Sequence, residues 1–403
     1  MNTAPAEGLR RMRTPSPDPK VGRTARPLRI LFTVNDLRPG GGQVRILRTC
    51  ETLVARGHRA TVATVWRDTP GSLWDRFAST ASRVESLRLR RSLLPMAVIH
   101  LARLIRQERI DVIHSTNTSW DLRLGLLGSA LTRTPLVNTF TSMHFSSVDT
   151  RRARIERRLE RGRIAIAICL SPAVVDSWRP YLADLGLTDD RIRIVSPGLP
   201  SFPLDEHAAS HARAKVRKTL QIGPKTPLVL NTARLTQGKG HMELAEAFRR
   251  VLGRHPNAVL AIAGDGELRS NLEQRIRETD LGRRVRLLGY RTDVPDLLAA
   301  ADLFVFPSHG EGFGNAAAEA MAAGLPVVAY DIQALRWYCR PGEAGELVPR
   351  GDVEALAEAV AGLLDDPDRR TALGSRGRYI ISTEHSSAAV ADELERIYAD
   401  LAL

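Results

Sequence analysis

Short apolar runs alternate with longer segments of helical period from residue 29 onward. Arg29–Val34 is followed by Gly40-Gly41-Gly42, by a predicted helix that ends near Arg56, and by a second apolar run at Arg59–Val65. Short apolar runs separated by helices are typical of a parallel sheet that is buried on both faces. The later runs of this first series are Asp111–His114, Leu136–Phe140, Ile164–Cys169 and Ile192–Val195.

The same alternation restarts after Pro197-Gly198-Leu199-Pro200. One predicted helix of this second series places Leu244, Ala245, Phe248, Val251 and Leu252 on a single face. The predicted strands are Leu228–Leu230, Val259–Ala263, Val285–Leu288, Leu303–Phe306 and Val327–Ala329. Two successive series predict an α/β fold of two doubly wound, Rossmann-like domains, for which 403 residues supply enough chain. The polar segment 196–221, with three prolines, is expected to link them.

Residues 1–27 contain five prolines, six arginines or lysines, and no apolar period. This composition predicts a disordered basic tail. No apolar run along the chain approaches the roughly 18 residues that a membrane-spanning helix needs. Three widely spaced cysteines favour neither a disulfide framework nor a zinc site, and a reducing cytoplasm is the expected compartment.

The positive charge of the chain belongs to one half. The net charge is +13, but residues 1–204 hold 33 Lys+Arg against 17 Asp+Glu, whereas residues 205–403 hold 25 against 28. A charge of +16 in one half indicates a local anionic partner, which leaves nucleic acid, anionic lipid and an anionic substrate open. Aromatic residues make up only 5% of the chain and no nucleic-acid module is recognisable, which makes nucleic acid the weaker alternative.

The densest basic run contains seven arginines between Arg151 and Arg163, with Glu156 and Glu160 among them. A solvated helix accounts for this spacing. Alternatively, the run acts with the arginines of Arg83–Arg91 and the apolar Leu93–Ile99 in contacting an anionic membrane surface.

Two clusters could bind an anionic ligand. Gly40-Gly41-Gly42 lies between a strand and a helix, so it is either a ligand-binding loop at a helix N-terminus or a tight turn. Arg234 and Lys239 follow the strand Leu228–Leu230, and loops at the carboxyl ends of parallel strands bind ligands in doubly wound sheets. Two cations there suit a diphosphate, although two solvated surface charges would look the same.

A third cluster is the most informative. Residues 307–322 follow the strand Leu303–Phe306 and contain three glycines, then a predicted Ala-rich helix that starts near Asn315. Glu311 lies in the glycine loop and Glu319 in the first turns of that helix. A carboxylate can accept hydrogen bonds from two sugar hydroxyls, and a helix N-terminus between the two can hold a phosphate. Asp366-Pro367-Asp368, by contrast, is explained by an N-cap and a proline at the first helical position.

With these motifs in this order, residues 29–398 resemble the glycosyltransferase family 4 group of GT-B enzymes, also called group 1 glycosyltransferases. Glu311 and Glu319 match the Glu-x7-Glu signature, and Arg234 and Lys239 match the Arg-x4-Lys pair that binds the donor diphosphate. His144 matches the histidine of the family near the reacting sugar. Gly41-Gly42, Asp111–His114, Gly264-Asp265-Gly266 and residues 324–329 also fall in family order.

The resemblance implies a retaining hexosyltransferase that moves a sugar from a nucleotide-sugar, with UDP as the expected nucleotide, to a hydroxyl acceptor that is lipid-linked or a glycan precursor. It implies an acceptor-binding domain over residues 28–200 with the C-terminal helix 388–403, and a nucleotide-sugar-binding domain over 201–387, facing each other across a cleft. No metal and no cofactor are expected. The expected location is the cytoplasm, with peripheral membrane association through the basic half left open.

The site residues implied by the resemblance fall into two groups. The catalytic group is His144, Arg234, Lys239 and Glu311. The donor-binding group is Gly41, Gly42, Arg234, Lys239, Gly264, Arg291, Glu311, Gly312, Phe313, Gly314, Asn315 and Glu319.

The sequence departs from the family pattern at two places. Pro197 stands where the family usually has Asn, and Asp331–Tyr338 replaces a Gly-Gly-x-Pro-Glu loop, with Trp337 near the position of the Glu. In the family the replaced loop usually lies near the donor, so its loss leaves the identity of the donor open without affecting the expected fold. A nucleotide-sugar epimerase of the same architecture remains the alternative activity.

Overall fold

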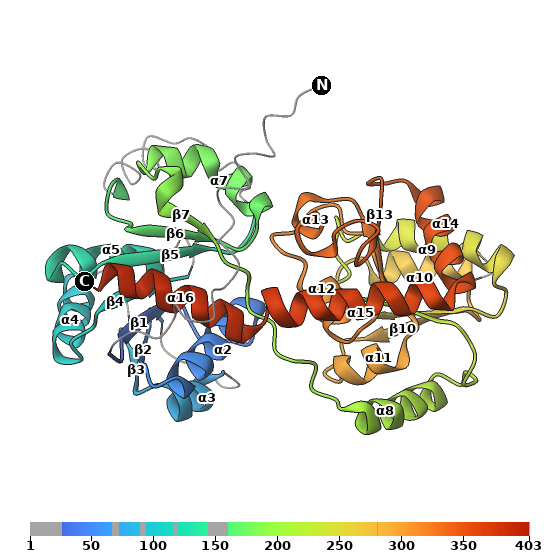
Figure 1. Cartoon of the computed structure of the whole chain (residues 1–403), viewed down its shortest axis with the longest axis horizontal. Coiled ribbons are helices and arrows are strands. Elements are labelled where there is room, and N and C mark those ends of the chain that lie inside the picture. The colour runs from blue at the N-terminus through green and yellow to red at the C-terminus, as the bar shows by residue number, and fades with distance from the viewer. Residues whose placement is uncertain are drawn as a thin grey trace. The chain divides into compact units, whose positions relative to one another are not determined.

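The computed structural model describes residues 26–66, 72–88, 94–116, 120–143, 160–279 and 281–402. The chain forms two compact units, which are described separately (Figure 1). The first unit extends to Gly198 and also contains the segment from Ser387 onward, and the second comprises Leu199–Ser386. Most of the predicted basic tail, together with His144 and residues 151–159 of the basic run, lies outside the described residues.

The first unit contains a parallel sheet with the strand order β3-β2-β1-β4-β5-β6-β7. The chain order reverses between β1 and β4, where Phe32 pairs with His114. The strands are β1 (Arg29–Val34), β2 (Arg59–Thr64), β3 (Arg83–Ser86), β4 (Val112–Ser115), β5 (Leu136–Phe140), β6 (Ile166–Cys169) and β7 (Ile192–Ile194). The helices are α2 (Gly41–Ala55), α3 (Trp74–Thr80), α4 (Leu94–Gln107), α5 (Trp120–Thr132), α7 (Pro172–Asp184) and α16 (Ser387–Leu401), with a 3₁₀ turn η2 at Asp189–Arg191.

Both faces of this sheet are buried, which explains the near-continuous apolar runs. Along β1, Leu31 joins one core cluster, whereas Ile30 and Phe32 join the cluster on the opposite face. The C-terminal helix α16 belongs to this second cluster, to which it contributes Val390, Leu394, Ile397 and Tyr398, and it packs against α2.

The second unit contains a parallel sheet with the strand order β10-β9-β8-β11-β12-β13, which reverses between β8 and β11. The strands are β8 (Leu228–Thr232), β9 (Val259–Ala263), β10 (Val285–Gly289), β11 (Leu303–Phe306), β12 (Val327–Tyr330) and β13 (Glu346–Val348). The helices are α8 (Glu206–Thr219), α9 (His241–Arg254), α10 (Arg269–Arg277), α11 (Val294–Ala300), α12 (Asn315–Ala322), α13 (Gln333–Cys339), α14 (Val353–Asp365) and α15 (Pro367–Glu384). The prediction of two doubly wound, Rossmann-like units is therefore confirmed.

The prediction of a linker over residues 196–221 was wrong in part, because α8 occupies its second half. Asp205 caps α8 by accepting a hydrogen bond from the backbone N–H of Ala208. The guanidinium of Arg217 is buried and donates to a carboxylate oxygen of Asp302 at 2.7 Å, and Arg213 donates to the other oxygen at 2.6 Å. These two ion pairs hold a polar helix against the body of the second unit.

The two short edge strands β3 and β13 were not predicted either. Every residue of β3 is only half-buried, and β13 has three residues. Other local predictions are confirmed: Asp366 caps α15 through the N–H of Arg369 at 2.8 Å, with Pro367 in the first helical position. Among the described residues, no helix combines the length and apolar character that crossing a bilayer requires.

Candidate active site

The predicted donor residues of the second unit follow the carboxyl ends of four strands. Arg234 and Lys239 follow β8, Gly264 follows β9, Arg291 follows β10, and the glycine loop 310–314 follows β11. Because all four strands are parallel, these loops lie at one edge of the sheet. The strands β8 and β11 are neighbours at the point of reversal, which is where doubly wound sheets bind ligands.

An ion pair joins the loops after β8 and β11. Lys239 Nζ lies 2.5 Å from Glu311 Oε1, and the two side chains are 23% and 15% exposed. Ser308 Oγ donates to the same carboxylate oxygen at 2.7 Å. The backbone adds a further link, since the N–H of His309 donates to the carbonyl of Gly238 at 2.8 Å. The carboxylate of Glu311 is therefore held in place and remains partly accessible.

Two glycines allow these loops to touch. Gly240 has a φ of +71°, and a Cβ at this position would collide with the carbonyl oxygen of Pro307. Gly264 has a φ of +151°, and a Cβ there would collide with the carbonyl oxygen of Ala233. No larger residue fits either position without moving backbone. The loops after β8, β9 and β11 are consequently packed backbone against backbone.

The helix α12 begins at the centre of this edge. Gly314, in the left-handed region with a φ of +91°, is its N-cap, and no side chain caps the first turn. The hydroxyl of Tyr338 donates to the carbonyl of Gly314 at 2.9 Å, and the buried Phe313 packs against the Tyr338 ring. Uncapped N–H groups and the positive end of the helix dipole favour an anion here. The exposed Asn315 is the first residue of the helix.

The remaining predicted donor residues differ in their surroundings. Arg234 is exposed and has no ion-pair partner among the residues that the structure describes. Arg291 forms a two-bond ion pair with Asp293, at 2.8 and 2.6 Å, and the Asp293 hydrogen bonds raise the pKa of Arg291. Gly312, in the loop before α12, and Glu319, in α12, are both half-buried.

The atypical segment Asp331–Tyr338 contributes α13 to this region. Trp337 contacts Phe313 edge-on, with ring centroids 6.0 Å apart, and His385 at 4.7 Å. His385 is 3% exposed and neither ring nitrogen has a hydrogen-bond partner in the described structure. Burial, followed by the charge of Arg340, lowers the pKa of His385 to about 4. The rings of Trp337, Tyr338 and His385 therefore pack around Phe313 and support the glycine loop.

Gly41 and Gly42 belong to the first unit, in the first turn of α2. A Cβ would meet nothing within 4 Å at either glycine, and no side chain caps this helix. Both glycines are exposed, and these surroundings fit a ligand loop and a turn equally. His144, the remaining predicted catalytic residue, lies outside the described residues.

His114, from the Asp-Val-Ile-His strand, has a structural position. Its Nδ1 lies 2.5 Å from the hydroxyl of Tyr398 on α16, and its Nε2 lies 2.6 Å from Thr139 Oγ1. Burial, assisted by the positive charge of Arg45, lowers the pKa of His114 to about 3. The neutral imidazole thus ties the C-terminal helix to the first sheet.

Sequence reasoning missed Ser308 and Tyr338 as partners of the site. Ser308 is 1% exposed and Tyr338 is fully buried. Both lie in or beside segments that the motifs had marked. For Ser308, the available signal was a small polar residue next to the glycine loop. No group of three or more potential metal-binding side chains occurs in the described ranges.

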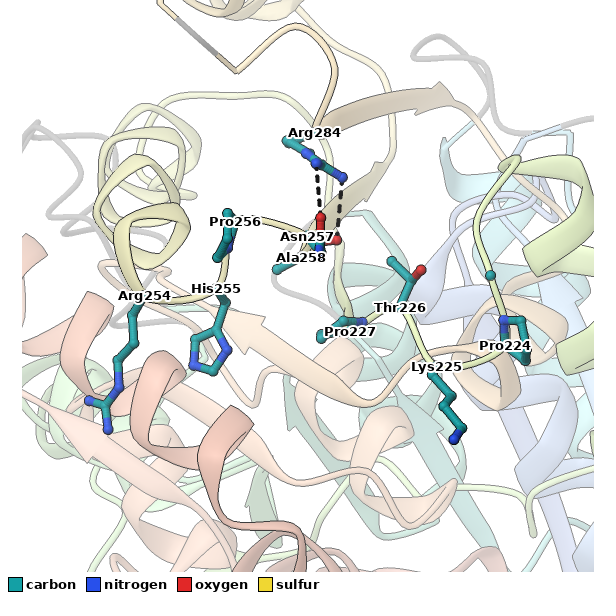
Figure 2. Close-up of a pocket in the computed structure, with 11 residues that line it drawn as sticks. Pro224, Lys225, Thr226, Pro227, Arg254, His255, Pro256, Asn257, Ala258 and Arg284 are labelled. Carbon is teal, nitrogen blue, oxygen red and sulfur yellow. Dashed lines mark hydrogen bonds between the residues drawn. The ribbon is translucent and has the colours of Figure 1, made fainter.

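A hollow of about 620 Å³ lies elsewhere in the second unit (Figure 2). Pro227, Ala258 and Arg284 line it, and they directly precede β8, β9 and β10. It is therefore at the amino edge of the sheet, opposite the predicted donor residues. Arg284 donates to Asn257 Oδ1 at 3.3 Å across its rim.

Comparison with known proteins agrees with this architecture. Residues 212–379 match the family described as Glycosyl transferases group 1, and residues 39–201 match Glycosyltransferase Family 4. The D-inositol 3-phosphate glycosyltransferase of Corynebacterium aurimucosum is 30% identical over 305 residues, 72% of each chain. The lipopolysaccharide core biosynthesis glycosyltransferase LpsE of Rhizobium meliloti is 28% identical over 367 residues, 90% of this chain and 96% of that one.

Solved structures show the same fold. Anabaena Alr3699/HepE in complex with UDP superposes with a TM-score of 0.78 at 22% identity, covering 93% of this chain and all of that one. WaaG, a glycosyltransferase involved in lipopolysaccharide biosynthesis, gives 0.66 at 19% identity, covering 91% and 99%. The fold and the site thus define a GT-B glycosyltransferase. The chain belongs to the group 1 glycosyltransferases of family 4.

Proposed function

We propose that the protein transfers a sugar from a nucleotide-sugar to a hydroxyl group with retention of anomeric configuration, and that the second unit binds the donor. The observation that carries this proposal is the Lys239–Glu311 ion pair at the point of strand reversal, beside the uncapped start of α12. It joins a cation suited to a diphosphate and a carboxylate suited to sugar hydroxyls in one place.

In this mechanism the donor diphosphate lies between Lys239, the exposed Arg234 and the N–H groups that follow Gly314. The bond between the sugar C1 and the diphosphate oxygen breaks while the acceptor oxygen attacks C1 from the same face. The acceptor proton passes to the departing diphosphate oxygen. Fixed cations and helix N–H groups stabilise the negative charge that develops there, so no metal ion is required for this step.

The carboxylates would hold the rest of the donor. Glu311, kept in position by Lys239 and Ser308, accepts hydrogen bonds from the transferred sugar, and Glu319 accepts those of the ribose. His144 is proposed to contact the sugar, and Gly41 and Gly42 to leave room for the phosphates. The acceptor would bind the basic first unit, where an anionic group or an anionic membrane surface is the expected partner.

UDP is the proposed nucleotide, in a cytoplasmic enzyme. Anabaena Alr3699/HepE has been crystallised with UDP and with UDP-glucose. A GDP-mannose-dependent mannosyltransferase of Corynebacterium glutamicum, 34% identical over 49% of this chain and 52% of its own, provides the competing choice. The donor test must therefore include both nucleotides.

The decisive experiment is a thermal-shift screen of UDP-, GDP- and ADP-sugars, followed by NMR analysis of the product made from the donor that binds. We expect one UDP-sugar to raise the melting temperature, and an α-linked donor to give an α-glycoside. Stabilisation by GDP-sugars alone would overturn the nucleotide assignment, and a β-glycoside would overturn retention. Conversion of the donor without an acceptor would instead indicate an epimerase.

A further inference from the structure

Exposed apolar side chains are concentrated on two helices of the first unit. Eight large apolar side chains are exposed among the described residues, and four of them lie on α4 and α5. Their exposed fractions are high: 64% for Met96, 49% for Ile99, 39% for Leu127 and 52% for Leu131. Single exposed apolar residues are ordinary on protein surfaces, but a group on adjacent elements marks an interaction site.

The helices α4 and α5 lie side by side (Figure 1). Their exposed apolar residues therefore lie on neighbouring helices. Met96, Ile99, Arg103 and Arg106 follow one another at helical spacing on the outer side of α4, and the opposite side carries the buried Leu101 and Ile105.

The packing of α5 against α4 brings the exposed residues of the two helices close together. A Cβ on Gly128 of α5 would come within 3.0 Å of the side chains of Leu101 and Ile105, so the helices are close. Arg106 Nη2 donates to the carbonyl of Leu131 at 2.9 Å. Leu127 lies one turn before Leu131. The α4–α5 face is defined here as Met96, Ile99, Arg103, Arg106, Leu127 and Leu131.

Within the described ranges, no carboxylate pairs with the cations of this face. Arg103 and Arg106 are exposed, and neither has a carboxylate partner in the described parts of the chain. The acidic residues around α4 are already committed elsewhere. Glu85 and Glu108 both pair with Arg83, and Asp111 pairs with Arg26. The α4–α5 face therefore presents aliphatic side chains next to two guanidinium groups that no described carboxylate neutralises.

We propose that the α4–α5 face docks on an anionic lipid bilayer. Aliphatic side chains gain free energy by entering the boundary of the acyl chains, while guanidinium groups remain at the level of the phosphates. Charge complementarity selects this occupant, because an excess of +16 in the first half of the sequence repels a second copy of the chain. This proposal rests on the proposed function, in which the first unit meets an anionic partner. It adds the surface at which a lipid-linked acceptor would be met.

The first test is sedimentation of the full chain with vesicles of phosphatidylcholine alone, or mixed with phosphatidylglycerol. Binding should require the anionic lipid and should weaken as the screening length falls from about 10 Å at 0.1 M salt to about 3 Å at 1 M. Replacing Arg103 and Arg106 together by Gln should weaken partitioning about 25-fold, at about fivefold for each charge. The matched control is Arg277→Gln with Arg283→Gln, which removes two exposed charges from the second unit.

The second test separates this face from the basic segments that the structure does not describe. All three native cysteines are buried, so a thiol-reactive, environment-sensitive fluorophore would label Ile99→Cys selectively. Anionic vesicles should shift its emission to the blue, whereas the same label on Tyr379→Cys, exposed in the second unit, should not change. Donor-induced thermal shifts, measured on the same variants, should match those of the wild type and report separately on the donor proposal.

Several results would overturn the docking proposal. These are no sedimentation of the wild type at low salt, equal binding to neutral vesicles, unchanged binding of the double arginine variant, or no shift from the Ile99→Cys label. Light scattering that shows a dimer, broken by Leu131→Ser, would assign the face to a second copy instead. If the wild type bound none of the nucleotide-sugars, the proposed function would be wrong, and the docking proposal would be unaffected.

Discussion

The two units share one architecture but differ in how tightly their carboxyl edges are built. Each sheet is parallel and reverses its order once, between β1 and β4 in the first unit and between β8 and β11 in the second. In the second unit, glycines allow the loops to pack backbone against backbone, and an ion pair joins them. In the first unit, Gly41 and Gly42 border open space. The carboxyl edge of the second unit is therefore closely packed, whereas the two glycines of the first unit are exposed and uncrowded.

The largest effect is expected from a substitution that disrupts this packing. Gly264→Ala places a Cβ on the carbonyl of Ala233, at a φ that L-residues rarely adopt, so the free energy of unfolding should fall by about 3 kcal/mol or more. Gly42→Ala is the matched change in the open edge, and it should be neutral or stabilise the helix by up to about 1 kcal/mol. Urea unfolding of both variants measures the contrast. Equal losses would mean that the two edges are packed alike.

The second effect concerns the cation between the loops. Lys239→Met should lower kcat/KM about 100-fold or more, because a fixed cation at the leaving diphosphate is lost. The free energy of unfolding should change by less than about 1 kcal/mol, since the ion pair is partly exposed. Lys225→Met, at the amino edge of the same sheet, is the control and should keep full activity. Normal turnover by the Lys239 variant would remove this residue from the mechanism.

The third effect tests the division of labour between the two carboxylates. Glu319→Ala should weaken donor binding by about 2 kcal/mol, the cost of losing charged hydrogen bonds to the ribose, measured by calorimetry with the nucleotide alone. Glu311→Ala should leave binding of the free nucleotide nearly unchanged and weaken only the nucleotide-sugar. If both variants lost affinity for the free nucleotide equally, the assignment of Glu311 to the sugar would be wrong.

The same comparison explains what the sequence could predict. The central strands were predicted because residues such as Val259–Ala263 are apolar on both faces and end at turn residues. The edge strand β3 was not predicted because it has one apolar residue in four, and it pairs with a neighbouring strand on one side only. The helix α8 was not predicted because ion pairs, rather than an apolar face, attach it to the unit. Arg213 and Arg217 both pair with Asp302, and this pairing depends on the tertiary fold.

For the site, the sequence could mark candidate residues, but it could not predict which of them are in contact. Lys239 and Glu311 were both expected in the donor site, yet their ion pair depends on β8 and β11 being neighbours, which strand patterns alone do not fix. Arg291 was expected to face the donor, and its pair with Asp293 two residues later was overlooked. Trp337 was noted only as a departure from the family, and its contacts with Phe313 and His385 appear only in three dimensions.

A smaller effect distinguishes the buried histidines of the two units. His385 has a pKa near 4 in the folded state and no hydrogen-bond partner in the described structure, so its neutral form is favoured there. As the pH falls below about 6.5, the unfolded chain binds the proton first and stability is lost, by about 1–2 kcal/mol at pH 5. His385→Phe should reduce this loss and preserve stability at neutral pH.

The matched variant in the first unit should behave differently. His114→Phe removes the hydrogen bonds to Tyr398 and Thr139, so it should destabilise the protein at pH 7 as well. Urea unfolding as a function of pH measures both variants. An unchanged acid slope in His385→Phe would show that this imidazole does not titrate between the folded and unfolded states.

The smallest expected effect is that of chelation. If Lys239, Arg234 and the start of α12 carry the charge of the leaving diphosphate, EDTA should leave the initial rate unchanged within error. The sharper version uses the Lys239→Met variant. Because its leaving group has lost a cation, added Mg²⁺ should restore part of its rate by neutralising the diphosphate in solution, while the wild type gains nothing. A wild-type enzyme that stops in EDTA and recovers with Mn²⁺ would show that the protein cations are insufficient, and the leaving-group role assigned to the second unit would then have to include a metal ion.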